Sequence, residues 1–216
     1  MPTTSEDDNG EYARAFARYK PLLEWMLHHD ILKFGIARES SVLDIGCGQG
    51  EDLVRFKEAG YKTVVGIDPD PDFVRTAQAK GLDIRLGTME ATGVDKSSVD
   101  VVVVDNVFHH THSYENDLNE LARVLKPGGF LHFIEPRNSL LRRLVDWLTF
   151  KTIVGSLPGP FKTRYNVMIH EINSGLYPQW LRSHDAFFEI LNKDFEVTKL
   201  KKGPFFWFGT AVRRQR

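Results

Sequence analysis

The stretch VLDIGCGQGEDL, residues 42–53, joins an apolar run to a glycine-rich turn and two acids. Its first four residues predict a buried strand. Three glycines then stand at alternate positions, where the missing Cβ allows a sharp turn and a close approach to a ligand: Gly46, Gly48 and Gly50. A turn of this kind that leads into a helix often holds phosphates. Glu51 and Asp52 open the helix and would repel them, so the stretch favours a nucleoside-like ligand without phosphates, preferably a cation.

Asp68 closes the next β-branched run, 20 residues after Gly48. On a sheet of this kind, an acid at that place accepts hydrogen bonds from both ribose hydroxyls. S-adenosylmethionine meets these conditions, because it offers adenosine without phosphate, a sulfonium cation and an ammonium group. The dinucleotide fingerprint GxGxxG would need glycine where Glu51 stands. Two alternatives remain: a nicotinamide-dependent oxidoreductase, and a scaffold protein that binds S-adenosylmethionine without catalysis.

Short β-branched runs alternate with helical patterns between residues 41 and 136, which predicts an α/β fold with helices on both faces of a parallel sheet. Strands are expected at 41–46, 62–68, 82–87, 99–106 and 130–136. Helices are expected at about 52–59, 72–79 and 115–125, the last ended by Pro127-Gly128-Gly129. A further helix capped by Ser183 should precede a hairpin of strands at 195–203 and 205–214.

The length of 216 residues fits a single domain. We divide it into an N-terminal helical segment (1–39, with helical spacing over 12–34), a cofactor-binding core (40–136), a cap insertion (137–182) and a C-terminal helix with hairpin (183–216). The cap is too aromatic for disorder and is expected to close over the site as a lid. One helix is expected in it at 140–154.

Five segments follow one another in a specific order and spacing: VLDIGCGQG, VVGIDPD, LGTMEA, VDVVVVDNVFHH and LARVLKPGGFLHFIEP. They resemble the class I S-adenosylmethionine-dependent methyltransferases, of the small-molecule, methyltransferase-11 type, over roughly residues 40–136. The resemblance implies a doubly wound, seven-stranded Rossmann-like sheet with a C-terminal antiparallel hairpin. It also implies an enzyme that transfers a methyl group to a small-molecule acceptor by in-line displacement, a reaction in which the protein mainly positions the reactants.

The same resemblance assigns cofactor contacts. In proteins of similar pattern, the acid at Asp44 helps to hold the methionine ammonium, the glycine turn wraps the amino-acid tail and Asp68 binds the ribose. The positions implied are Asp44, Gly46, Cys47, Gly48, Gly50, Asp68, Pro69, Thr88, Met89, Glu90, Asp105, Asn106 and Val107. Related proteins often have an acid at the position of Thr88 that accepts from the adenine amino group. Here a hydroxyl or the neighbouring Glu90 would have to do so.

His109 and His110 follow the fourth expected strand at the mouth of the site, where an imidazole could act as a general base or position the turn. We favour positioning, and no cluster with metal-ligand spacing indicates a metal. In the cap, Tyr165 and the pair His170-Glu171 are base candidates by location only. Lys162 and Arg164 are expected to bind an anionic or amphipathic acceptor.

Charge is unevenly distributed, although the formal net charge is only -1. Residues 1–136 carry a net charge of -9 and residues 137–216 carry +8. A net charge this close to zero offers no bulk attraction to nucleic acid, and we expect no nucleic-acid partner. A single cysteine and the lack of a signal-peptide pattern favour the cytoplasm. For the apolar stripe at 140–154, packing against the domain is the preferred interpretation, an acceptor pocket the second and peripheral membrane contact the least favoured.

Overall fold

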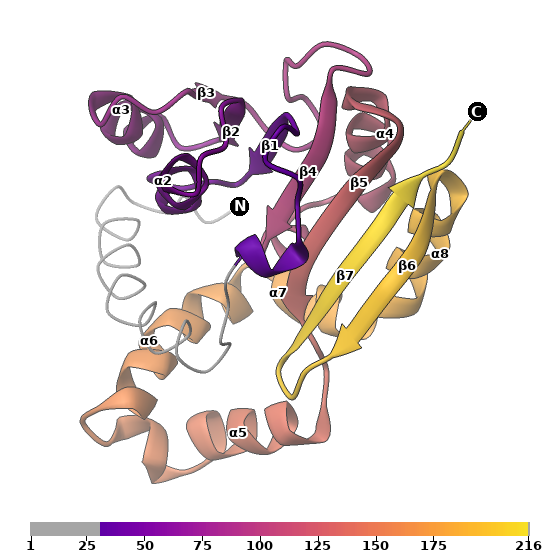
Figure 1. Cartoon of the computed structure of the whole chain (residues 1–216). Coiled ribbons are helices and arrows are strands. Elements are labelled where there is room, and N and C mark those ends of the chain that lie inside the picture. The colour runs from indigo at the N-terminus through magenta and orange to yellow at the C-terminus, as the bar shows by residue number, and fades with distance from the viewer. Residues whose placement is uncertain (1–30, 216) are drawn as a thin grey trace.

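The computed structural model of the chain describes residues 31–215 (Figure 1). Most of the helical spacing expected over residues 12–34 lies outside this range. Its end forms a short 3-10 helix, η1 (Ile31–Phe34).

Seven strands form one sheet in the order β3-β2-β1-β4-β5-β7-β6. The first five are parallel, and β7 pairs antiparallel with both β5 and β6, which confirms the expected C-terminal hairpin. The strands are β1 (Val42–Ile45), β2 (Val64–Asp68), β3 (Ile84–Leu86), β4 (Val99–Asp105), β5 (Leu125–Pro136), β6 (Phe195–Lys202) and β7 (Phe206–Arg213).

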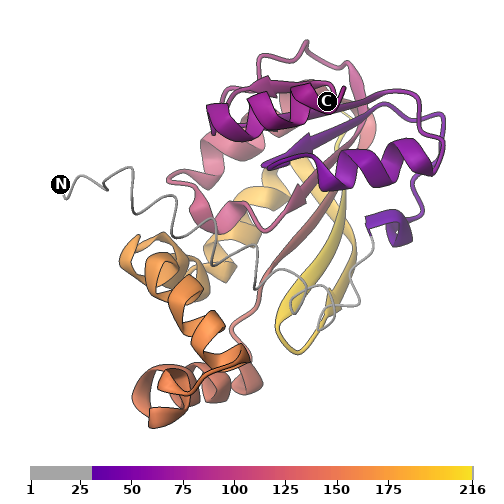
Figure 2. The same cartoon turned by 90° about the vertical axis from the view of Figure 1, so that its left-hand side faces the viewer.

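Helices cover both faces of the sheet (Figures 1 and 2). On one face, α2 (Glu51–Glu58) and α3 (Pro71–Ala79) bury Leu53, Phe56, Val74 and Ala77. On the other face, α4 (Tyr114–Val124) and α8 (His184–Asp194) close a larger core around Leu121 and Phe187. Apolar residues thus lie on both sides of the central strands, as expected for the interior of a doubly wound sheet.

Two expected helix ends differ in detail from the structure. The third helix ends at Val124 and not at the Pro-Gly-Gly sequence, because β5 starts at Leu125 and includes Pro127 near its beginning. Ser183 does precede α8, but its side chain does not cap the helix. Its hydroxyl lies 3.0 Å from the Tyr114 hydroxyl, so it joins α8 to α4.

The cap contains more helix than expected. It comprises α5 (Leu140–Lys151), the 3-10 helix η3 (Ile153–Ser156), α6 (Pro160–Asn173) and α7 (Leu176–Arg182). The expectation that the stripe on α5 packs against the domain was wrong: Leu140, Leu144 and Trp147 are exposed, whereas Arg142 and Thr149 are buried. Within residues 31–215, no helix has the length and apolar character needed to cross a bilayer.

Candidate active site

The carboxyl ends of β1 and β4 lie side by side at the centre of the sheet. The chain runs from β1 outward to β2 and β3, and from β4 outward in the opposite direction to β5. In open α/β sheets, ligands bind in the crevice that forms where the direction of winding reverses. The glycine turn after β1 and the segment after β4 therefore lie at the expected place for a ligand.

Two positions of the turn require glycine, each for a different structural reason. Gly46 has a φ of +69°, and a Cβ there would lie 2.4 Å from Val107, which follows β4. Gly50 has a φ of +83°, and a Cβ there would lie 2.4 Å from Leu82. Gly46 thus lets the turn approach the end of β4, and Gly50 lets α2 pack closely against the sheet.

Asp68 ties the end of β2 to the glycine turn. Its carboxylate accepts hydrogen bonds from the Gly48 N–H at 2.8 Å and the Asp70 N–H at 2.9 Å. Burial raises the pKa of Asp68, and these two donors partly offset the effect. An ionised carboxylate offers about four acceptor sites, so two bonds leave capacity for a ligand hydroxyl.

A pocket of about 190 Å³ opens beside this crevice. It brings together residues from five segments of the chain, including many of the expected cofactor contacts. Its lining consists of Ile45, Gly46, Ile67, Pro69, Gly87, Thr88, Met89, Glu90, Val107, His110, Thr111, His112 and Asp117.

The other expected cofactor positions lie at strand ends and in the glycine turn, next to this lining: Asp44, Cys47, Gly48, Gly50, Asp68, Asp105 and Asn106. Asn106 has a φ of +58° and donates from Nδ2 to Asp105 at 2.7 Å. A left-handed residue other than glycine is uncommon and is often found at functional sites. Cys47 packs its thiol into the core against Gly66. Its pKa is raised by burial and by Asp44, so the thiol stays protonated.

Asp117 lines the pocket although the sequence did not single it out. The side chain comes from the first turn of α4 and is 2% exposed. Its Oδ2 atom is buried and has no hydrogen-bond partner within the described part of the chain. Burial raises the pKa of Asp117 to about 6. A buried carboxylate oxygen without a donor is a place for a ligand N–H or O–H.

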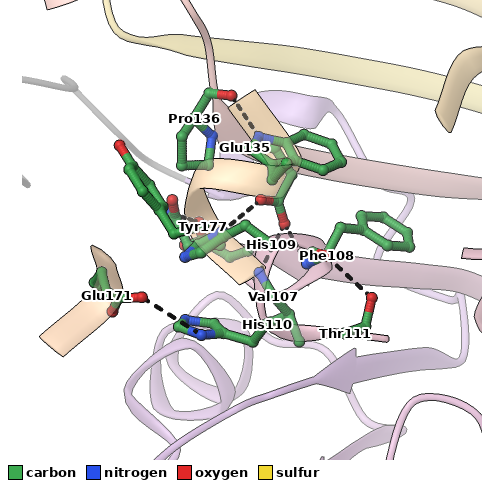
Figure 3. A network of polar contacts seen from close by, with 12 residues as sticks. Val107, Phe108, His109, His110, Thr111, Glu135, Pro136, Glu171 and Tyr177 are labelled. Atoms are coloured by element: carbon green, nitrogen blue, oxygen red, sulfur yellow. Dashed lines mark hydrogen bonds and ion pairs between the residues drawn. The ribbon is translucent and has the colours of Figure 1, made fainter. Parts of the chain in front are cut away.

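The turn that carries the histidines is held by Glu135 from β5 (Figure 3). The N–H groups of Val107 and Phe108 donate to Glu135 Oε1 at 2.7 and 2.6 Å. Glu135 Oε2 lies 2.7 Å from Nδ1 of His109. Burial raises the pKa of Glu135 to about 8 and lowers that of His109. This supports a positioning role for His109, and Glu135 is the partner that sequence inspection missed.

His110 differs from His109 because it lines the pocket and its side chain is 43% exposed. Its Nδ1 lies 3.6 Å from Oε2 of Glu171, which α6 contributes from the cap (Figure 3). The pKa of His110 is lowered because the surrounding protein desolvates the ring on the side that is not exposed, and because His109 is adjacent. His110 is therefore neutral at pH 7, with Nε2 as the ring nitrogen that does not face Glu171.

His109, His110 and Glu171 also form a set of candidate metal ligands, since their ligand atoms all lie within 4.8 Å of one another. The sequence did not indicate a metal here, because Glu171 is distant along the chain from the two histidines. Tyr177 from α7 also packs beside His109, with the centres of the two rings 5.5 Å apart.

The expected acceptor-binding residues of the cap lie elsewhere. Arg164 is buried, and its guanidinium donates to Asp146 and Thr149, so it holds α6 against α5. Lys162 is exposed, with Nζ 5.3 Å from the centre of the Tyr165 ring. Neither these residues nor His170 are part of the pocket lining. The cap reaches the pocket through Glu171 instead.

The sheet order, the glycine turn and the acid at the end of β2 agree with the resemblance to the class I S-adenosylmethionine-dependent methyltransferases. Residues 43–133 match the family model described as methyltransferase domain, so this part of the chain is a methyltransferase domain. It is 35% identical over 129 residues to an uncharacterized methyltransferase of Mycobacterium tuberculosis, an alignment covering 58% of this chain and 49% of the relative. It is 32% identical over 116 residues to a tRNA U34 carboxymethyltransferase of Cellvibrio japonicus, covering 50% and 36%.

A solved structure from Pyrococcus horikoshii has the same fold, with a TM-score of 0.68 at 18% identity, covering 94% of this chain and 99% of that one. The chain spans about half the length, or less, of the curated relatives it matches. The likeness to the curated relatives thus concerns the methyltransferase domain and not their whole length.

Proposed function

We propose that this protein transfers a methyl group from S-adenosylmethionine to a small-molecule acceptor, with His110 as the general base. The observation that carries this proposal is the place of His110, which lines the same pocket as Thr88 and Met89, the residues expected at the adenine edge. A base that shares a pocket with the cofactor site can take a proton from an acceptor held there.

The residues present fit the proposed cofactor. The glycine turn leaves room for the amino-acid tail, and Asp68 retains acceptor capacity for ribose hydroxyls. Asp117 offers a buried oxygen without a donor, beside Met89 and Glu90. We assign this oxygen to the adenine amino group, because Thr88 stands where related proteins often have an acid. Glu51 and Asp52 at the start of α2 disfavour the pyrophosphate of a nicotinamide cofactor.

When bound, S-adenosylmethionine supplies an electrophilic methyl group. The task of the chain is to orient the acceptor and to remove its proton. His110 accepts this proton on Nε2, and the carboxylate of Glu171 stabilises the imidazolium that results. Glu135 fixes the turn from which His110 projects, through the N–H groups of Val107 and Phe108. An oxygen or nitrogen acceptor would suit this chemistry.

A small acceptor is favoured over nucleic acid by the charges around the pocket: among residues 31–215, its lining includes Glu90 and Asp117 but no lysine or arginine. A phosphate backbone is normally bound by clusters of lysine and arginine. A tRNA substrate is the contrasting hypothesis, and unmodified tRNA should therefore be assayed beside a metabolite extract.

The test compares His110→Gln and Glu171→Gln with the parent protein, using transfer of labelled methyl groups to components of a metabolite extract. We expect His110→Gln to lower turnover by about 10²–10⁴-fold, Glu171→Gln to lower it less, and both to keep the parent's affinity for S-adenosylhomocysteine. His112→Gln, in the same pocket, is the matched control and should remain active. Full turnover by His110→Gln would show that His110 is not the general base. Loss of cofactor affinity would instead indicate that the pocket was disturbed.

A further inference from the structure

The helix α5 has its apolar residues on the outside. Its buried side chains are Arg142 and Thr149, whereas Leu140 is 83% exposed and Trp147 is 56% exposed. The stripe continues through η3, where Ile153 is 76% exposed, and reaches Phe161 at the start of α6. Water-soluble helices normally bury the apolar stripe, so this inversion calls for a partner.

The buried polar groups account for the orientation of α5. Arg142 donates to the hydroxyl of Tyr177 and, at 2.7 Å, to the carbonyl of Phe205. Asp146 and Thr149, on the same side of α5, bind the guanidinium of Arg164 on α6. These contacts hold the polar side of α5 inward. As a consequence, Leu140, Leu144 and Trp147 on the opposite side of α5 point outward.

Exposed apolar side chains are concentrated in this one region. Of the ten large hydrophobic residues exposed within the described part of the chain, seven belong to residues 140–161. We name them the apolar surface of the cap: Leu140, Leu141, Leu144, Trp147, Ile153, Leu157 and Phe161. In Figures 1 and 2, α5 and the adjoining part of α6 project from the sheet at the lower end of the molecule.

The charges around the apolar surface of the cap have one sign. Arg143, Lys151 and Lys162 are the exposed charged residues among the described side chains of residues 140–162. Asp146, the acid in this range, is half-buried against Arg164. Apolar residues with tryptophan, bordered by basic side chains, are the composition that binds the surface of anionic bilayers.

We propose that the apolar surface of the cap docks on the surface of an anionic lipid bilayer. Leu144, Trp147 and Ile153 insert at the level of the headgroups, while Arg143, Lys151 and Lys162 contact lipid phosphates. The helix α6 leads from this surface to the pocket: ten residues separate Phe161 from Glu171, which at the helical rise is about 15 Å. Docking thus brings the pocket close to the bilayer. This inference does not depend on the identity of the methyl acceptor.

The test is co-sedimentation of the full chain with phosphatidylcholine vesicles, with and without phosphatidylglycerol. We expect binding to the vesicles that contain phosphatidylglycerol, weakened by salt. Combining Leu144→Ser, Trp147→Ser and Ile153→Ser should lower the partition coefficient by about tenfold or more, because each side chain loses apolar area to bury. Combining Arg143→Gln, Lys151→Gln and Lys162→Gln should remove the preference for the anionic lipid.

The matched control is Leu86→Ser combined with Phe130→Ser, two exposed apolar residues outside the cap. This control should sediment like the parent, and thermal unfolding should show that all variants remain folded. Failure of the parent to bind either vesicle would overturn the proposal. Equal binding by the triple serine variant would do so too. A parent dimer in sedimentation velocity that the serine variant abolishes, without vesicle binding, would assign the surface to a second copy of the chain.

Discussion

Glu135 Oε2 and His109 Nδ1 lie 2.7 Å apart with both side chains buried, the carboxyl fully so. The hydrogen bond joins the middle of the sheet to the turn that follows β4. Because the same carboxyl accepts from two backbone N–H groups, it replaces the sheet bonds that the chain loses where it leaves β4. The geometry of His110 in the pocket thus depends on a residue of β5.

Glu135→Gln should change how stability depends on pH. The pKa of Glu135 is raised to about 8 in the folded protein, whereas an unfolded glutamate titrates near 4.3. Between these values the unfolded chain loses a proton that the folded chain keeps, so stability falls as pH rises through this range. Glutamine imitates the protonated acid and cannot ionise. We expect Glu135→Gln to remove most of this decline, which is about 2 kcal/mol between pH 6 and pH 8. Urea unfolding of parent and variant at both pH values measures it.

Glu135→Ala separates ionisation from hydrogen bonding. It leaves the N–H groups of Val107 and Phe108 without their acceptor, at a cost of about 1–3 kcal/mol for each buried group. A glutamine variant whose stability follows the parent's pH dependence would show that Glu135 does not titrate in this range.

Asp68→Ala should weaken the binding of S-adenosylmethionine by about 1.5–3 kcal/mol, the scale of a hydrogen bond to a charged group. The variant also frees the N–H of Gly48, which loosens the glycine turn. Isothermal titration calorimetry with S-adenosylmethionine and S-adenosylhomocysteine measures the effect. Asp72→Ala, an exposed acid paired with Arg75 on α3, is the matched control. Equal affinities of the parent and the two variants would show that Asp68 does not bind the ribose.

The places of the glycine turn and of Asp68 in the fold could be predicted because these residues lie in short contiguous motifs. The glycine turn and Asp68 take their places from strand ends, which β-branched runs reveal. Glu135 and Asp117 could not be found in this way, and Glu171 was a candidate only through its location in the cap. His109 and Glu135 are 26 residues apart, and Glu171 reaches the site from the cap. Such contacts depend on how segments pack together, which no local pattern records.

The cap shows a second limit of sequence patterns. The spacing of Leu140, Leu144 and Trp147 correctly predicted a helix with one apolar side. It could not predict which side faces inward, since that depends on partners for Arg142 and Asp146 from distant segments. Periodicity identifies a stripe, whereas the buried polar contacts decide its direction.

Asp117→Asn should lower the affinity for the cofactor and should also make this affinity less dependent on pH. The pKa of Asp117 is raised to about 6, and the ionised carboxylate is the better acceptor for an adenine amino group. The parent should therefore bind S-adenosylhomocysteine more weakly as pH falls from 7 to 5, while the asparagine variant should show a flatter profile. An analogue with a carbonyl in place of the adenine amino group provides the check. If parent and variant prefer the amino compound equally, Asp117 does not contact the amino group.

Zinc should inhibit methyl transfer by occupying the set formed by His109, His110 and Glu171. Imidazole and carboxylate are common zinc ligands, and closure of atoms already within 4.8 Å needs small movements. Zinc on Nδ1, the nitrogen that faces Glu171, would leave the ring proton of His110 on Nε2, so that Nε2 could no longer accept a proton. We expect inhibition by added zinc that a chelator reverses, with weaker inhibition of Glu171→Gln, which has lost one anionic ligand. The chelator alone should leave the untreated protein active. Loss of activity on chelation, restored by zinc, would instead show that the metal belongs to the working site and that His110 acts as a ligand.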